Sequence, residues 1–297
     1  NIKSNLSKDK NFVWIKRNIT PREHQKIINL GEVGLQTGLE KKRVYPHREI
    51  ASHIVGFSNI DGEGLSGIEK GLHHKLDLGK SVSLSIDIRI QNSTRNELIK
   101  TIQKFSAKSG SVIVMDIKSG EIISIINYPD FDPNKYDNLL TKYQFNNATQ
   151  GVFEMGSTFK PITMAIGLDS NIIDLNMLFD VSKPIIIGKH KIDDFKPYKG
   201  KLDVKGIIIK SSNIGAAKIA KKIGKKNQIK YFKRFGFFKE VDLEVEETQK
   251  PLPPSHWNVT ETMTIGYGHG FAITPLHLCQ AYASIVNRGF KVRPTLV

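Results

Sequence analysis

A serine and a lysine stand three residues apart in the stretch EMGSTFKP, residues 154–161. A serine hydroxyl is a poor nucleophile without an adjacent base, and a lysine can be that base when burial or a nearby cation lowers its pKa. The spacing alone is weak evidence. The composition predicts about two to three such pairs by chance, and the chain holds two, at Ser7 and Ser157. The residues around each pair must distinguish them.

Around Ser157 the neighbours favour a helix start. Pro161 lacks an N–H and is tolerated only near the beginning of a helix, and Gly156 supplies a flexible entry. Ser157 then lies at the positive end of the helix dipole, where its backbone N–H offers half of an oxyanion hole. Lys160 projects from the same helical face. Ser7 has no apolar helix behind it. An ordinary helix N-cap with a solvated lysine remains the alternative for Ser157.

A second polar cluster, Ser211-Ser212-Asn213, interrupts an apolar helical pattern over residues 204–224. Such residues at a helix junction are commonly caps. In a functional interpretation, one hydroxyl passes protons to a leaving amine, and the amide holds both Lys160 and a substrate carbonyl. The pattern predicts two helical pieces joined at residues 211–213.

The sequence predicts some of the helices and strands that would position these residues. Residues 109–129 predict a β-hairpin whose turn contains Gly120 with positive φ. Residues 81–90 alternate like a strand, and the spacing of Ile90, Leu98, Ile102 and Phe105 predicts one helical face. A later helix covers residues 277–289. Residues 1 to about 80 suggest strands with turns and a short helix near residues 65–76, too little core for a catalytic domain.

Composition excludes several classes of protein. The single Cys279 rules out an internal disulfide framework and a cysteine-based metal cluster, and no H-E-x-x-H pattern occurs, so no metal site is expected. No run of eighteen apolar residues suggests a membrane span. The net charge of +15 would suit an anionic partner, but only 9 of the 44 basic residues are Arg, which argues against nucleic-acid binding.

Taken in order, the motifs resemble the class B penicillin-binding proteins, the serine D,D-transpeptidases of peptidoglycan synthesis. GSTFKP matches their S-x-x-K motif, and SSN follows Lys160 by 51 residues. The resemblance extends to three further stretches, at residues 109–134, 266–289 and 56–70. It covers the chain from about Gly34 onward. The KSSN stretch is similar to the division-specific (septal) branch.

The resemblance implies an α+β fold, with an antiparallel sheet covered by helices and a helical subdomain. Residues 1–80 would form part of a small, β-rich, non-catalytic pedestal, and residues 81–297 the transpeptidase domain. It implies Ser157 as nucleophile, Lys160 as base, and Ser211 and Asn213 as further catalytic residues. Gly156, Thr158 and Ser212 would contact substrate. The implied partners are peptidoglycan stem peptides, β-lactams and cell-division membrane proteins, at a bacterial inner membrane with the catalytic domain in the periplasm. No cofactor is implied.

One departure from the family pattern stands out. A third motif, K-[ST]-G on a C-terminal strand, is expected well after the GYG stretch, whereas the sequence given ends at Val297. The triplets at residues 108–110 and 118–120 precede the nucleophile and are interpreted as structural. The expectation is that the C-terminal strands are missing and that this polypeptide alone is weakly active or inactive, since losing one oxyanion donor lowers a rate by roughly 10²–10³.

Three other functions stay open. A serine β-lactamase needs a glutamate that activates water, and residues 240–250 lack the pattern of such loops. A penicillin-recognising sensor or scaffold would keep the serine without turnover, and the sequence does not separate it from a synthase. Nucleic-acid binding driven by charge is the least favoured.

Overall fold

The computed structural model describes residues 11–138, 141–188 and 190–297. They form two compact units. The first comprises the described residues up to Val44 together with Ile60–Gly62, and the second comprises Tyr45–Asn59 and Glu63–Val297. Ser7, the chance match to the serine–lysine pattern, lies outside the described residues. Each unit is described by itself.

The first unit contains one helix, α2 (Pro21–Asn29). Thr20 and Glu23 cap it reciprocally, and Pro21 occupies its first turn, where no N–H is needed. None of the helix residues is buried. The Arg17 guanidinium pairs with the carboxylates of Glu40 and Asp61.

The strands expected in residues 1–80 are not found in the described part of that segment, where the only pairing is an isolated bridge between Ser58 and Gly64. Short apolar runs form strands only where a partner segment pairs with them over several residues, and in the described part of this segment the pairing stops at that one bridge. The expected helix near residues 65–76 is present as two short helices, α4 (Gly67–Gly71) and α5 (His73–Asp77). The functional boundary at residue 80 stays a prediction.

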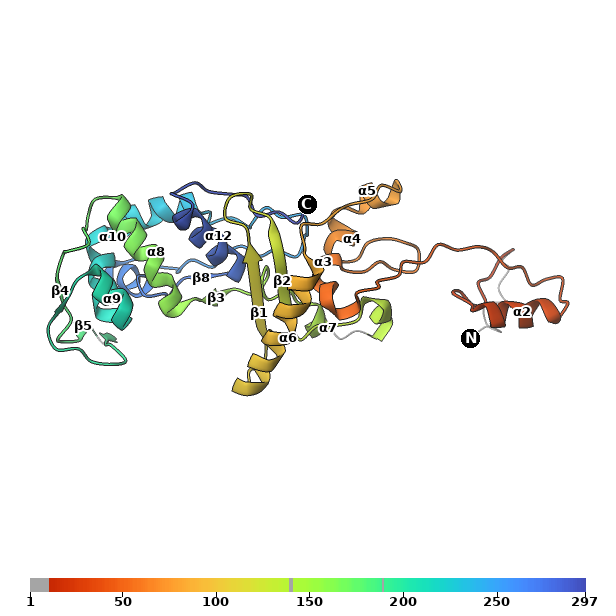
Figure 1. The fold of residues 1–297 in the computed structure, drawn as a ribbon, viewed down its shortest axis with the longest axis horizontal. Coiled ribbons are helices and arrows are strands. Elements are labelled where there is room, and N and C mark those ends of the chain that lie inside the picture. Colours follow the sequence, from red (N-terminus) through yellow and green to blue (C-terminus); the bar gives the residue numbers. More distant parts are fainter. Residues whose placement is uncertain (1–10, 139–140, 189) are drawn as a thin grey trace. The chain divides into compact units, whose positions relative to one another are not determined.

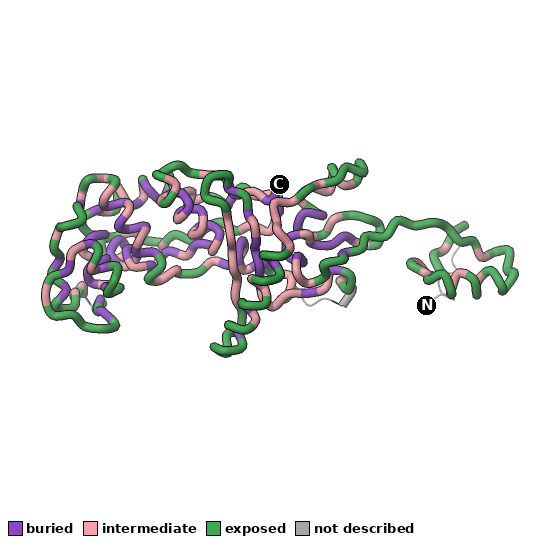
Figure 2. Tube along the Cα trace, in the orientation of Figure 1, coloured by how far each residue is buried: buried purple, intermediate pink, exposed green. Residues whose placement is uncertain are grey.

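The second unit is built around the predicted hairpin. β1 (Gly110–Met115) pairs antiparallel with β2 (Ile122–Tyr128), in register from Gly110↔Tyr128. In the turn, Asp116 Oδ1 accepts the backbone N–H groups of Lys118 and Ser119 at 2.8 Å, and Gly120 has φ 83°. β2 is the more deeply buried of the two strands (Figure 2).

One long helix, α6 (Ile88–Phe105), packs against this hairpin (Figure 1). Leu98 and Ile102 are buried against Ile126, as the helical spacing predicted, whereas Ile90 and Phe105 are exposed. The strand expected at residues 81–90 is not formed, since α6 begins at Ile88 and Asp87 caps it. An Asp side chain that accepts a first-turn N–H starts a helix despite alternating hydrophobicity.

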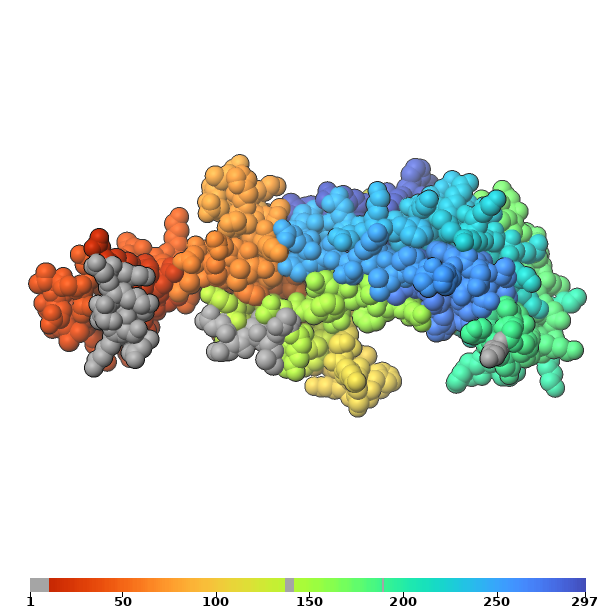
Figure 3. Space-filling model, turned by 180° about the vertical axis from the view of Figure 1, so that it is seen from behind, coloured from red at the N-terminus to blue at the C-terminus, as the bar shows by residue number. Residues whose placement is uncertain are grey.

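Helices account for more residues than strands in the described part of the second unit, and its cyan to blue residues cover much of the face seen in Figure 3. Its principal helices are α8 (Lys160–Asp169), α9 (Val204–Lys210), α10 (Asn213–Phe235), α11 (Val259–Ile265) and α12 (Pro275–Val286). The shorter helices are η1 (Arg48–Ala51), α3 (Ser52–Val55), η2 (Pro133–Asn138), α7 (Thr141–Gln144) and η3 (Gly156–Phe159). α9 and α10 are the two pieces predicted around residues 211–213.

Three small strand pairs brace the helical part: β3 (Phe153–Glu154) with β8 (Ala272–Ile273), β4 (Phe179–Asp180) with β7 (Lys201–Leu202), and β5 (Ile185–Ile187) with β6 (His190–Ile192). An aromatic cluster fills the core between α8 and α10. Phe159 and Phe232 meet edge-on with ring centroids 5.5 Å apart, and Phe237, Trp257 and Phe271 also pack against Phe232. α10 is kinked at Gly224, which has φ 73°.

Candidate active site

Ser157 lies on η3, the single 3-10 turn that precedes α8. β3 leads into this turn, and Gly156 enters it with φ 55°. Pro161 stands in the first turn of α8, where its missing N–H leaves no hydrogen bond unmade. The helix start predicted at Ser157 is therefore confirmed. The Ser157 side chain is exposed, so a peptide can reach its hydroxyl.

The Lys160 side chain is buried beside that hydroxyl, with only 1% of the residue exposed. Its Nζ lies 3.1 Å from Ser157 Oγ, 2.9 Å from Ser211 Oγ and 2.6 Å from the Ser211 carbonyl oxygen. A protonated ammonium has three N–H donors, and these three acceptors use all of them. After losing a proton, the amine has a lone pair that can accept the Ser157 hydroxyl proton over this distance.

Ser211 brings the second motif to the first. It ends α9 in the left-handed conformation, with φ 53°, and its backbone N–H donates to Ile208. Its hydroxyl donates to Ser157 Oγ at 3.1 Å. Ser157, Lys160 and Ser211 therefore form a closed triangle of polar atoms, in which a proton can pass between any two members.

Burial lowers the pKa of Lys160 to about 8, and the nearby Asp194 carboxylate opposes this by raising it. Burial disfavours the charged form of an amine, which brings the neutral base within reach of ordinary solution pH. The amine thus meets the condition for a general base that its sequence context could only suggest.

Asn213 does not hold Lys160, which corrects the expectation for this amide. Its Nδ2 donates instead to the Asp193 carbonyl at 3.0 Å. The reason is the arrangement around Lys160, whose three donors are taken by Ser157 and Ser211.

Ser212 is buried beside this site, with only 1% of the residue exposed. Its hydroxyl accepts the Gly215 N–H at the start of α10 and donates to Asp194 Oδ2 at 2.7 Å. Ser212 positions the motif through these bonds, and its contact with substrate stays a prediction.

Asp194 belongs to this arrangement, and the sequence analysis missed it. Its buried carboxylate accepts the Ser212 hydroxyl and, through Oδ1, the Ile214 N–H at 2.9 Å. A negative charge near a helix N-terminus is stabilising. Here the Asp194 carboxylate links the loop before α10 to the Ser211-Ser212-Asn213 motif. The only sequence signal was the pair Asp193-Asp194 in an otherwise basic stretch.

The variant Asp194→Asn is expected to move the rate–pH profile of Ser157 acylation to lower pH, because the carboxylate that raises the pKa of Lys160 is gone. The free energy of unfolding should also fall by about 1–3 kcal/mol, because the variant loses one buried hydrogen-bond acceptor. Acylation rates across pH, with thermal unfolding, measure both. Asp242→Asn is the matched control, since that exposed side chain pairs with Arg293 at the surface, away from the site. A shift to higher pH in Asp194→Asn contradicts the assignment.

The remaining predicted residues shape the turn itself. Thr158 Oγ1 donates to the Met155 carbonyl at 2.6 Å, and the Thr158 carbonyl accepts the Tyr282 hydroxyl at 2.6 Å. The Gly156 N–H donates to the Gly268 carbonyl at 3.1 Å. The substrate contacts of Gly156 and Thr158 stay predictions. Of the two Lys-Ser-Gly triplets, Lys118–Gly120 forms the hairpin turn and Gly110 opens β1.

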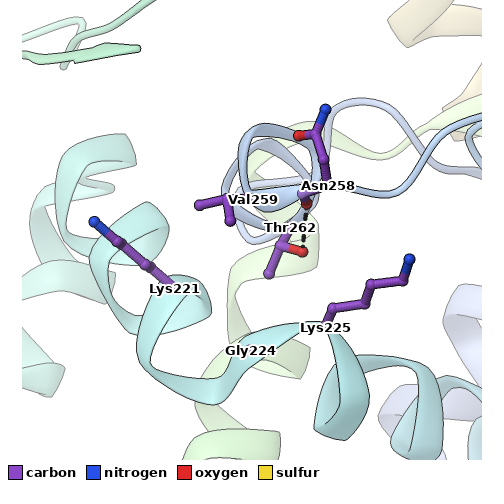
Figure 4. A pocket seen from close by; sticks show the side chains of 6 residues that line it. All are labelled: Lys221, Gly224, Lys225, Asn258, Val259 and Thr262. Atoms are coloured by element: carbon purple, nitrogen blue, oxygen red, sulfur yellow. Dashed lines mark hydrogen bonds between the residues drawn. The ribbon is translucent and has the colours of Figure 1, made fainter.

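A separate hollow of about 380 Å³ lies where α10 kinks beside the start of α11 (Figure 4). Lys221, Gly224 and Lys225 line it from α10, and Asn258, Val259 and Thr262 from the other side. None of the predicted site residues lines it.

In the part of the chain that the structure describes, no group of three or more His, Cys, Asp or Glu side chains is placed to hold a metal ion. No described helix has the length and apolar character to cross a bilayer.

Comparison with known families places the chain clearly. Residues 110–297 match the penicillin binding protein transpeptidase domain. The probable peptidoglycan D,D-transpeptidase FtsI of Caulobacter vibrioides is 34% identical over 94% of this chain and 48% of its own length. Peptidoglycan D,D-transpeptidase FtsI of Escherichia coli is 28% identical over 94% of this chain and 52% of its own length. The chain thus spans about half the length of the curated relatives it matches.

Two solved structures share the fold of the chain. A putative peptidoglycan glycosyltransferase from Atopobium parvulum superposes with a TM-score of 0.76 and 26% identity, over 86% of this chain and 64% of the other. The TP domain of penicillin-binding protein 3 from Burkholderia pseudomallei superposes with a TM-score of 0.64 and 30% identity, over 72% of this chain and 60% of the other.

Proposed function

Because the chain belongs to the penicillin-binding protein transpeptidase family, we propose that the protein is a serine D,D-transpeptidase that crosslinks peptidoglycan stem peptides through an acyl-enzyme on Ser157. The observation that carries the proposal is the position of the buried Lys160 amine, 3.1 Å from Ser157 Oγ and 2.9 Å from Ser211 Oγ. Such an amine activates an adjacent hydroxyl and relays its proton.

In the first half of the reaction, neutral Lys160 takes the Ser157 proton while Oγ attacks the carbonyl between the two terminal D-alanines of a stem peptide. The Ser157 N–H, at the positive end of a helix, donates to the oxyanion. The bond to the terminal D-alanine then breaks. Ser211 passes a proton to the departing amine, a role supported by its contacts with both Lys160 and Ser157.

In the second half, the amine of a neighbouring stem peptide attacks the Ser157 ester, and Lys160 accepts its proton. The bond between Oγ and the acyl carbon then breaks, and Lys160 returns the proton to Ser157 Oγ. Asn213, held by the Asp193 carbonyl, orients the acyl chain. β-Lactams resemble the terminal dipeptide and stop the enzyme at the ester. No cofactor takes part in these steps.

The wider assignment follows relatives that are named FtsI, which supports a role in septal wall synthesis during cell division. We place the protein at the bacterial inner membrane with the catalytic domain in the periplasm, among membrane proteins of division and glycan polymerisation. Residues 1–80 would serve as a non-catalytic module and residues 81–297 as the transpeptidase domain.

The complete gene product should be incubated with a fluorescent penicillin, and the modified residue mapped by peptide mass spectrometry. The expected result is one label on Ser157, absent in Ser157→Ala, and release of D-alanine from a peptide ending in D-Ala-D-Ala. Fast hydrolysis of the penicillin would indicate a β-lactamase. Labelling without release of D-alanine or acyl transfer would indicate a sensor or scaffold. Absence of any label contradicts the proposal.

A further inference from the structure

Glu154, three residues before the nucleophile, joins two segments that are far apart in the sequence. β3 pairs with β8 through Glu154↔Ala272. The Glu154 carboxylate reaches beyond this pairing to the turn before β8, where Oε1 accepts the Gly270 N–H at 2.8 Å and Oε2 lies 3.2 Å from His269 Nδ1. Both carboxylate oxygens are thus bound to the turn at residues 266–270. These bonds hold the pKa of Glu154 below its usual range.

The same turn supports the backbone of the nucleophile. The Gly268 carbonyl accepts the Gly156 N–H at 3.1 Å, and a Cβ on Gly268 would stand only 2.0 Å from the Gly156 carbonyl oxygen. The buried Thr163 hydroxyl of α8 donates to the Gly266 carbonyl at 2.8 Å. The residue directly before Ser157 therefore rests on the backbone of this turn.

The turn is held in part by its own backbone, where the Gly268 and His269 N–H groups donate to the Ile265 and Thr264 carbonyls. Gly268 and Gly270 both have positive φ, at 92° and 85°. Glycine reaches this conformation without strain but loses more freedom than any other residue when it is fixed there. At Gly270 the contact comes from outside the turn, since the Glu154 carboxylate accepts the Gly270 N–H and also contacts the His269 ring.

We propose that Glu154 is a positioning residue, which clamps the turn at residues 266–270 against Gly156 and so fixes the direction of the Ser157 hydroxyl and N–H. Glu154 touches neither reacting atom and acts through Gly268 and Gly156. The inference rests on the proposed function, because it concerns the rate at which Ser157 is acylated.

The test compares Glu154→Ala and Glu154→Gln with the wild type in the complete gene product. With a fluorescent penicillin, Glu154→Ala should lower the limiting acylation rate about 10- to 100-fold, because small misplacements of a reacting group reduce rates by this order, while the concentration for half-maximal rate changes little. Glu154→Gln keeps an acceptor for the Gly270 N–H and should recover part of the rate. Glu97→Ala is the matched control, since Glu97 pairs with Lys100 on the exposed face of α6.

Hydrogen exchange provides a second readout that does not depend on activity. Amides in peptides covering residues 264–272 should exchange faster in Glu154→Ala, with unchanged exchange in β1 and β2. Unchanged exchange in that segment, or a limiting rate within about twofold of wild type, overturns the inference. If wild-type protein is not acylated, the proposed function fails instead, and the exchange experiment still decides whether the clamp exists.

Discussion

Replacing Lys160 with glutamine is expected to slow acylation of Ser157 by penicillin about 10³-fold, within the range that general bases contribute. Glutamine is of similar length and polar, so it can fill the buried position, but its amide does not accept a proton. The remaining rate would come from substrate binding and the Ser157 N–H. Stopped-flow or gel-based labelling with a fluorescent penicillin measures the effect.

The rate–pH profile makes this prediction specific to the base. In the wild type, acylation should rise as pH increases through about 8, because the neutral amine is the active form and burial lowers the pKa of Lys160 to about 8. The Lys160→Gln variant should lose this rise. Lys222→Gln, which removes an exposed lysine on α10, should keep both rate and profile. A Lys160→Gln variant with the wild-type profile would show that another group is the base.

Gly268→Ala is expected to reduce acylation by at least about 10²-fold. The added Cβ would lie 2.0 Å from the Gly156 carbonyl oxygen and 2.5 Å from the Gly156 nitrogen, so the backbone before Ser157 has to move. These are backbone atoms, and no flexible side chain can yield in their place. The measurement is the acylation rate of folded protein, with thermal unfolding recorded for each variant.

Gly270→Ala separates this clash from backbone strain. Both glycines have positive φ, and alanine at either position is strained by roughly 1–2 kcal/mol. At Gly270, however, the nearest atom to the added Cβ is Thr264 Oγ1 at 3.4 Å, which is ordinary contact. Gly270→Ala should therefore carry the strain without the clash, and be acylated much faster than Gly268→Ala. Equal rates in the two variants would mean that strain in the turn, rather than displacement of Gly156, controls Ser157.

The parts of the site that the sequence predicted are those fixed by local rules. Pro161 limits where a helix can begin, and three-residue spacing places Lys160 beside Ser157. The interruption at Ser211–Asn213 ends one helix and caps the next. In each case the residues that determine the geometry are close together in the chain.

The parts that escaped prediction depend on contacts between distant segments. Asp194 meets Ile214 across 20 residues, and Glu154 meets Gly270 across 116. No periodicity or spacing encodes such pairs. The strands expected in residues 1–80 failed for a related reason, because strand formation depends on partners that a local pattern cannot supply.

The aromatic cluster of the core has a consequence for how the nucleophile is kept in place. Phe159, two residues after Ser157, is 1% exposed and packs on Phe232 and Phe237, which lie beyond the kink in α10. The turn that carries the reactive hydroxyl is thus anchored in a buried aromatic cluster, although Ser157 itself is exposed. Substitutions that loosen this core should therefore slow the acylation of Ser157, even when every residue of the active site is unchanged.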